Sequence, residues 1–491
     1  MSLDLHGLPV TLKAVMSDTP QAREADRQSL PGAALSTPAS PVIEHKPVIR
    51  YPVRAKITEF ELTDFPSYDE AVAVPVVKGT PYLKYGIHAY CFFNFKSRKC
   101  LCVEIGHWDI IAPGLSPFIK ALGRNDTWLT RGSIFFEKFH YGFSFLEQIM
   151  LMTVPHAVTA LGNGKFLVNL WSYVGYLEVD CRTKEVAYLS RLGQSPDQVL
   201  GSQQWLHRPS DEIFFTTYSL PESLKKISAP SLPVPCKVLK MNRGSGDTAE
   251  VWNGLLTDYL HDILVNKTGQ YCVVCELGMF QDRKNNTIPS HVLIIDLNRN
   301  RHWVISRFIV AAHAQFDPEE PDTIYFSNHN FKFIPTSIFT LLRKGIYSLK
   351  FLGPASVHKY RLTPEGPQEI GVFSEPDMFR LTNFHVFMHR GKKTLAAMGF
   401  PNFIYLADAE SMKLIRKITV NHRRSYKTLF GKPPCFIGTF SPSSDGERLY
   451  VQTTRSFQII DVESGEAVNH MPLAYNHTAA NHMQTTPDVA W

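Results

Sequence analysis

The sequence predicts an all-β protein with the architecture of a seven-bladed β-propeller, and three observations support this prediction. Units that pair an apolar strand, a polar turn and a second apolar strand recur at intervals of about fifty residues, a period typical of propeller blades. Each unit continues into a further strand, for example at 175–180, 292–296 and 457–461. Finally, 491 residues exceed the usual size of one domain, but closed repeat folds grow by adding units around one axis.

The repeat pattern divides the chain into a tail and a ring. Residues 1–50 are rich in Pro, Ser and Ala and are expected to be disordered or to wrap loosely, whereas 51–491 are expected to form the propeller. A strand predicted at 55–62 is expected to complete the last blade and so join the two chain ends. Aromatic-rich segments at about 108–152 and 330–356 break the repeat, and we interpret them as helical or loop insertions that cap one face.

Composition excludes several classes of protein. The formal net charge of +6 is small for 491 residues, and Lys and Arg are scattered, so nucleic-acid binding is not expected. No apolar run is long enough to span a membrane, and the N-terminus lacks a signal-peptide pattern. The eight cysteines show no disulfide spacing, which predicts reduced thiols and a cytoplasmic location. The oligomeric state stays open.

Histidines lead several of the repeated units. His156, His261, His313 and His385 each stand at the start of the first strand of a unit, and His88 holds a similar place in a less regular unit. The innermost strands of a propeller line its central channel, so equivalent residues on successive blades form a ring around one axis. These histidines are therefore expected to converge although they are far apart in the sequence.

Converging histidines point to a metal. A single histidine at a strand end is more often a hydrogen-bonded channel residue, but four at one shared position favour a ligand set. Neutral imidazoles without thiolates suit a divalent first-row transition metal, and Mn or Fe is the expected ion. We therefore predict His156, His261, His313 and His385 as metal ligands.

The neighbouring residues supply candidates for substrate binding and proton transfer. Alignment of the turns places Gln204, or Gln203 beside it, at the histidine position of another unit, where a neutral amide is expected to bind substrate, with Trp205 as a wall of the cavity. The predicted catalytic bases are His88, His329 and Lys392. Asp262 follows a predicted ligand, and either orients an imidazole or forms a hydrogen bond between blades.

The unit that begins at His313 resembles the metal-bearing blade of the oligogalacturonate-lyase-like propellers. It reads His313-Ala-Gln315-Phe-Asp-Pro-Glu-Glu-Pro-Asp-Thr-Ile-Tyr-Phe, and in that family three histidines and a glutamine hold Mn(II) within seven blades. The resemblance implies a metal role for His313 and a role in metal or substrate binding for Gln315. The unit continues as Ser-Asn-His-Asn where that family has Cys-His-Glu-Gly, so the sugar-acid substrate of the family is not implied.

A second, shorter resemblance involves Leu260-His261-Asp262. This segment is similar to the His-Asp blade start of the carotenoid-cleavage-type oxygenases, which have seven blades and hold Fe(II) with four histidines. The sequence spacing of those ligands is not reproduced in this chain. The two resemblances imply the same architecture and different chemistries.

Three functional hypotheses follow. The first is a metal-dependent lyase or isomerase that binds a small oxygen-rich substrate and needs no oxidant. The second is a non-haem Fe(II) oxygenase that acts on an apolar substrate. The third is a non-catalytic interaction propeller, although the sequence shows no repeated series of the Gly-His and Trp-Asp pairs that mark WD repeats.

Overall fold

The structure is a computed structural model, and it confirms an all-β chain built as a seven-bladed β-propeller. In the described residues every regular element is a strand. This part of the chain contains no helix long and apolar enough to cross a membrane. The described residues are 49–78, 87–105, 155–170, 175–190, 198–219, 233–256, 259–277, 290–308, 311–335, 347–379, 383–421, 437–453, 456–473, 476–477 and 482–491.

Blades 1 and 2 contain strands from both ends of the chain. The sheet of blade 1 runs β2-β5-β4-β3-β32, with β33 also paired to β3, and that of blade 2 runs β1-β9-β8-β7-β6. Their strands are β1 (Ile49–Pro52), β2 (Ala55–Glu61), β3 (Ala71–Lys78), β4 (Ile87–Asn94), β5 (Lys99–Ile105), β6 (Pro155–Gly162), β7 (Lys165–Leu170), β8 (Gly175–Asp180), β9 (Glu185–Ser190), β32 (Asn476–His477) and β33 (Gln484–Thr486).

Blades 3, 4 and 5 are four-stranded antiparallel sheets, and a separate hairpin, β20-β21, interrupts blade 5. Blade 3 comprises β10 (Gln198–His207), β11 (Glu212–Ser219), β12 (Val234–Asn242) and β13 (Thr248–Leu256). Blade 4 comprises β14 (Tyr259–Val265), β15 (Tyr271–Leu277), β16 (Ser290–Asp296) and β17 (Arg301–Phe308). Blade 5 comprises β18 (Ala311–Phe316), β19 (Thr323–Asn328), β22 (Ser356–Thr363) and β23 (Gly366–Phe373), with the hairpin formed by β20 (Phe331–Pro335) and β21 (Tyr347–Phe351).

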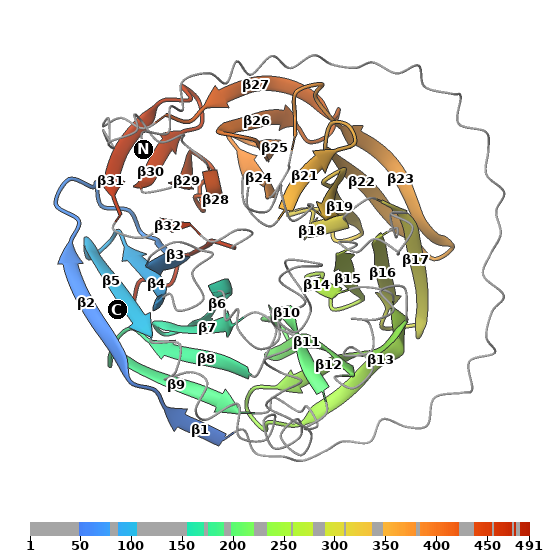
Figure 1. Cartoon of the computed structure of the whole chain (residues 1–491), viewed down its shortest axis with the longest axis horizontal. Coiled ribbons are helices and arrows are strands. Elements are labelled where there is room, and N and C mark those ends of the chain that lie inside the picture. Colours follow the sequence, from blue (N-terminus) through green and yellow to red (C-terminus); the bar gives the residue numbers. More distant parts are fainter. Residues whose placement is uncertain are drawn as a thin grey trace, which may run out of the picture. The chain divides into compact units, whose positions relative to one another are not determined.

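Blades 6 and 7 complete the ring, and in Figure 1 the first strand of each of blades 3 to 7 lies nearest the centre. Blade 6 comprises β24 (Phe384–His389), β25 (Lys392–Gly399), β26 (Phe403–Asp408) and β27 (Lys413–Thr419). Blade 7 comprises β28 (Ile437–Pro442), β29 (Arg448–Thr453), β30 (Ser456–Asp461) and β31 (Ala467–Pro472).

Ring closure differs from the expectation. The predicted strand at 55–62 exists as β2, but it pairs with β5 of blade 1 instead of completing the last blade. Blade 7 already has four strands of its own, so it has no place for β2. The ring closes because β32 and β33, from the other end of the chain, pair with β3 at the inner edge of blade 1.

A C-terminal strap, residues 482–491, reinforces this closure. The strap forms a parallel bridge between His482 and Ala157 of blade 2, and the side chain of Asp488 accepts a hydrogen bond from the backbone of Gly164 at 2.7 Å. Trp491 then packs edge-on against Phe92 and Phe166, with ring centroids 6.4 and 6.2 Å away. The strap thus joins blades 1 and 2 from the inside.

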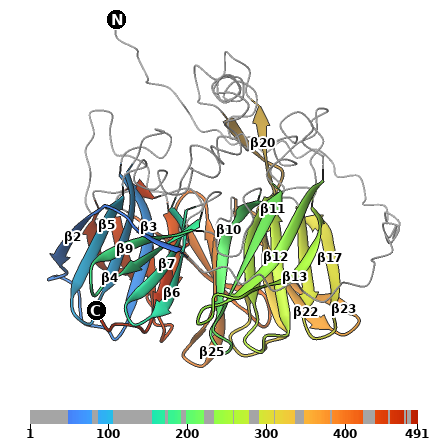
Figure 2. The same ribbon diagram turned by 90° about the horizontal axis from the view of Figure 1, so that it is seen from below.

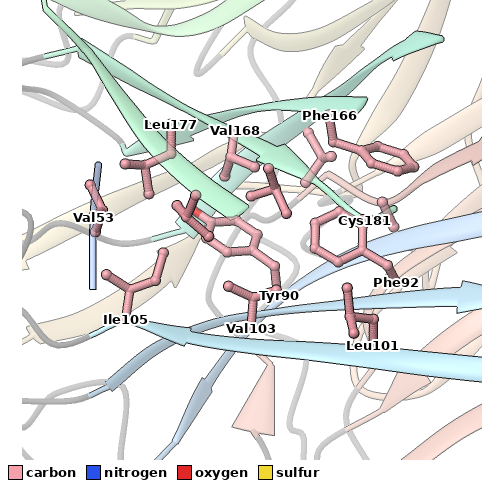
Figure 3. Close-up of a cluster of buried hydrophobic side chains, with 14 of the residues drawn as sticks. Val53, Tyr90, Phe92, Leu101, Val103, Ile105, Phe166, Val168, Leu177 and Cys181 are labelled. Carbon is pink, nitrogen blue, oxygen red and sulfur yellow. The ribbon is translucent and has the colours of Figure 1, made fainter. Parts of the chain in front are cut away.

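Apolar side chains between neighbouring blades form the core. Figure 3 shows this for blades 1 and 2, where Tyr90 and Phe92 face Phe166 and Leu177 across the interface. Strand position decides the pattern of burial. The second strand β25 is buried at seven consecutive positions, whereas the outermost strand of the same blade, β27, is mostly exposed. Central strands are covered on both faces, so they read as continuous apolar runs.

The two predicted insertions have different outcomes. The segment at 108–152 lies outside the described residues. The described part of 330–356 includes the β20-β21 hairpin, so strands occupy positions where helices or loops were expected. This hairpin rises from one face of the ring (Figure 2). The predicted tail, residues 1–50, lies outside the described residues except for its last two positions. These two residues belong to β1, which begins at Ile49.

Gly446 permits close packing between blades 6 and 7. It has a φ of +70°, and a Cβ built there would lie 1.8 Å from the backbone oxygen of Met388. We expect Gly446→Ala to destabilise the protein by well over the roughly 1–2 kcal/mol that a left-handed backbone costs an alanine, because two backbones would have to separate. The urea midpoint of unfolding measures this effect.

Gly391→Ala is the matched control, because Gly391 has a similar φ of +74° and nothing within 4 Å of its Cβ position. Equal losses for Gly446→Ala and Gly391→Ala would contradict the proposed clash.

A partly buried charge network around Lys393 joins blades 5 and 6. The ammonium group of Lys393 lies 2.8 Å from carboxylate oxygens of both Glu320 and Glu410 and 3.3 Å from Asp317, whose side chain is fully buried. Hydrogen bonds from Lys393 are the main cause of the lowered pKa values of Glu320 and Glu410. The network therefore holds both carboxylates in their charged form.

Candidate metal centre

Bulges at the start of the innermost strands position the candidate ligands. The ladder between β14 and β15 shifts between Leu260 and Asp262, and the ladder between β18 and β19 shifts between Ala312 and Ala314. The extra residue is therefore a histidine in both blades. A bulge bends its strand and redirects a side chain, and it often lies next to a functional site.

Related shifts occur in three other innermost strands. They fall at 155–158 in β6, 200–204 in β10 and 437–439 in β28. These are the positions that the turn alignment made equivalent to His261 and His313. Strand β24 is different, since it pairs with β25 without a shift. Five innermost strands therefore share an irregularity near the position where the repeated unit begins.

Four residues form an axial cluster: His261, Asp262, His313 and His482. One ligand atom from each lies within 4.8 Å of the others. The ring centroid of His313 is 5.2 Å from that of His261 and 4.7 Å from that of His482. Blade 4, blade 5 and the C-terminal strap thus each bring an imidazole to one point.

Asp262 links the members of the axial cluster. Its carboxylate lies 2.7 Å from Nδ1 of His261 and 3.9 Å from Nδ1 of His313, and it accepts a hydrogen bond from the backbone of Ala314 at 3.0 Å. This carboxylate orients His261 and connects blade 4 to blade 5. Both interpretations of Asp262 offered by the sequence are therefore realised.

Gln203 of blade 3 also reaches the axial cluster. Its amide nitrogen donates to the carboxylate of Asp262 and lies 2.6 Å from Nε2 of His482. The amide therefore contacts two members of the cluster at once.

The protonation states suit metal binding. Burial lowers the pKa of His482 to about 4, so this imidazole is neutral at pH 7 and one of its two nitrogens offers a lone pair. Burial alone would raise the pKa of Asp262, but the attraction and hydrogen bond of His261 outweigh it, and the pKa is lowered. A carboxylate and neutral imidazoles are donors that divalent Mn, Fe and Zn accept.

His385 is not among the four residues of the axial cluster, although its charge acts on His482, and its metal role stays a prediction. Its Nε2 donates to the carbonyl of Phe440 in blade 7 at 2.8 Å, and burial lowers its pKa to about 4. His385 therefore connects two blades. The metal role of His156 stays a prediction, because its side chain is outside the described residues.

The two predicted substrate-binding glutamines contact neighbouring blades. Gln204 donates to the hydroxyl of Thr159 in blade 2 at 3.1 Å. Gln315 accepts from the backbone nitrogen of Val386 at 2.9 Å and donates to its oxygen at 2.8 Å, so both ends of this amide are used. Gln203, and not Gln204, reaches the axial cluster. Trp205 is 40% exposed on β10, and its role stays a prediction.

The three predicted bases lie in different places. His329 follows β19, is buried, and has its ring centroid 5.4 Å from that of His313. His88 lies on β4, opposite Val77, and so belongs to the second strand of its blade; its side chain is not described. Lys392 is exposed at the start of β25, opposite His389, which lies four residues or about 13 Å along β24 from His385. Only His329 is shown next to the axial cluster.

A second group of possible ligands, Cys91, Cys100 and Cys102, lies within blade 1. All three thiols are fully buried in the apolar interface with blade 7, and burial raises the pKa of Cys91 and Cys100 well above the usual value. Charged thiolates are costly in such surroundings, so these residues are best understood as part of the core.

Comparisons with known proteins do not assign the chain to a family. No family model and no curated protein matches the chain. Among solved structures, the chain is similar to the dihydro-haem d1 dehydrogenase NirN in complex with DHE at 11% identity and a TM-score of 0.44, over 87% of this chain and 76% of that one. It is also similar to a Bacteroides fragilis protein named for 6-phosphogluconolactonase activity, at 12% identity and a TM-score of 0.45, over 85% and 98% of the two chains. These likenesses are too distant to support a function, which leaves the residues of the site to support it.

Proposed function

We propose that this chain is a metal-dependent enzyme whose axial cluster holds one divalent transition-metal ion, Mn or Fe. His261, His313 and His482 are the proposed ligands. The reaction that fits best is a lyase or isomerase step on a small oxygen-rich molecule. The observation that supports the proposal is that three imidazoles and a carboxylate, drawn from two blades and the strap, lie within 4.8 Å of one another.

The residues around the proposed ion have distinct tasks. Asp262 lies 2.7 Å from Nδ1 of His261 and so leaves Nε2 of that ring for the ion, an arrangement common around metal-bound histidines. A bound ion supplies Lewis acidity toward substrate oxygens. His329, whose ring centroid lies 5.4 Å from that of His313, is the proposed base that accepts a proton from an acidified C–H.

Gln203 is the proposed contact for a substrate oxygen. Its amide nitrogen already donates to Asp262 and approaches His482, which places a neutral donor beside the proposed ion. An amide donor and a cation together favour a ligand with several hydroxyl, carbonyl or carboxylate oxygens.

Metal loading tests the proposal. Protein stripped with a chelator and dialysed against Mn(II), anaerobic Fe(II) or Zn(II) is expected to retain one ion per chain by elemental analysis. His482→Ala is expected to lose the ion, because the strap contributes only this ligand. His302→Ala, an exposed histidine on β17, is the matched control and should load like the wild type. Equal loading of all three proteins, or none in the wild type, would contradict the metal site.

An Fe(II) oxygenase is the second proposed function, and the composition of the axial cluster favours it. Two histidines and a carboxylate on one side of an iron ion are a donor set used by non-haem oxygenases. Oxygen consumption by the iron-loaded protein with an apolar substrate would support this function. Turnover that is unchanged without oxygen, with Mn(II) bound, would support the lyase or isomerase.

A further inference from the structure

We propose a second, metal-independent site in blade 5, where Ser356, His358 and Glu369 form a Ser-His-Glu triad that hydrolyses small uncharged esters. The hydroxyl of Ser356 lies 2.8 Å from Nε2 of His358, and the carboxylate of Glu369 lies 2.7 Å from Nδ1 of the same ring. Nucleophile and carboxylate thus contact opposite nitrogens of one imidazole, which is the arrangement that activates serine in unrelated hydrolases.

The sheet geometry explains why the three side chains meet. Ser356 and His358 are two residues apart on β22, so their side chains point to the same face of the sheet. Glu369 comes from the neighbouring β23, where the ladder shifts between Lys359 and Tyr360. That bulge brings Glu369 diagonally toward His358, although Val372 is the residue directly opposite in the register.

The surroundings add two features of an acyl-transfer site. Asn328 of β19 is directly opposite Ser356 in the ladder, so both side chains share a face and their Cβ atoms are about 5 Å apart. The amide of Asn328 is thereby placed to donate to an oxyanion that forms beside the serine. Phe308 of blade 4, which is buried in the core between the blades, packs with its ring centroid 4.9 Å from that of His358 and holds the imidazole in place.

The triad is open to solvent to a limited extent. The side chains of His358 and Glu369 are 14% and 28% exposed, and Ser356 is 8% exposed. The approach to Ser356 is therefore narrow, and the proposed substrate is a small ester, not a folded protein.

The proposed reaction needs only water as its second reactant. The oxygen of Ser356 bonds to the ester carbonyl carbon while its proton moves to Nε2 of His358. The carbon–oxygen bond to the leaving alcohol then breaks, and the alcohol takes that proton. Water next attacks the acyl-serine, gives a proton to His358, and releases the acid as the proton returns to Ser356.

This site is separate from the proposed metal centre. His313 lies on β18, and β19 stands between β18 and β22 in the sheet, so the strands that carry the two sites are about 10 Å apart. No member of the axial cluster contacts the triad in the described structure. Ester hydrolysis is therefore expected to persist after removal of metal by a chelator.

A labelling experiment on the full chain tests the proposal. A fluorophosphonate probe is expected to modify Ser356, as located by peptide mass spectrometry, and the protein is expected to hydrolyse p-nitrophenyl acetate. Ser356→Ala should lose the label and at least about a thousandfold in kcat/KM. Ser374→Ala, an exposed serine of the same blade that donates to the carbonyl of Ala355 at 2.8 Å, is the matched control and should retain both.

Two further variants separate chemistry from folding. Asn328→Ala is expected to lower kcat by about a hundredfold or more through loss of the oxyanion donor. Glu369 acts through His358 as a positioning residue, so Glu369→Gln should lower kcat with little change in KM. The proposal is overturned if the wild-type protein is not labelled, or if its label is on another residue. Unaltered turnover in Ser356→Ala would also overturn it, whatever the outcome of metal loading.

Discussion

Replacing His313 with asparagine is expected to weaken the binding of Mn(II) or Fe(II) by at least about a hundredfold, because loss of a mere outer-shell partner already costs about 10- to 100-fold. Asparagine is the informative substitution because His313 has a φ of +51°, a conformation that asparagine also adopts readily. The backbone of the bulge is thereby kept while the imidazole is removed. Calorimetric titration of the metal-free protein with Mn(II) or Fe(II) measures the change in affinity.

His385→Gln is the control for this measurement. Glutamine keeps a side-chain donor near the carbonyl of Phe440, the group that His385 contacts at 2.8 Å, and it leaves the axial cluster intact. Metal affinity is expected to match the wild type. A large loss in His385→Gln, with normal binding in His313→Asn, would mean that the ion lies elsewhere in the channel.

Replacing Lys393 with methionine is expected to lower the free energy of unfolding by about 3–5 kcal/mol, the usual result of removing one partner from a buried ion pair. The fully buried side chain of Asp317 would lose a cation 3.3 Å away, and Glu320 and Glu410 would lose theirs at 2.8 Å. Lys359 contacts only Glu410 among these, at 3.1 Å, so it cannot replace the lost charge at Asp317. Urea unfolding at pH 7 measures the loss.

Lys392→Met provides the comparison at the adjacent position. Lys392 is exposed, and exposed substitutions usually change stability by no more than about 0.5 kcal/mol. Lys392 is also a predicted catalytic base, so its variant should be assayed for activity with the others. A loss in Lys392→Met as large as that in Lys393→Met would contradict the importance of the buried network.

The sequence predicted the architecture well because strand periodicity and turn spacing are local signals. Alternating apolar residues define a strand without knowledge of its partners, and regular spacing then implies a ring. The bulges at His261 and His313 were not predicted, but they fall where histidines lead the repeated units. Ring closure was predicted less well, since the pairing of β2 with β5 and of β33 with β3 depends on which edges remain open.

The composition of the axial cluster was only half predictable. His261 and His313 belong to repeated units, but His482 lies in the strap after the last blade and has no repeat to mark it. Its one signal was that a segment following blade 7 had to return toward the start of the chain. His385 shares the sequence position yet lacks the bulge, and the sequence contains no signal for that absence. The sequence also could not decide between Gln203 and Gln204. Adjacent side chains on a strand point to opposite faces, and the sequence does not show which face of β10 points toward the axial cluster.

The strap also constrains the order of assembly during biosynthesis. Strand β33 pairs with β3 across roughly 410 residues of intervening sequence, since Ala71 is opposite Thr486. Contacts this distant in sequence form slowly and late. When β31, the last strand of blade 7, leaves the ribosome, His482 and β33 are still to follow. A nascent propeller therefore cannot bind an ion through His482 until this last segment has been released.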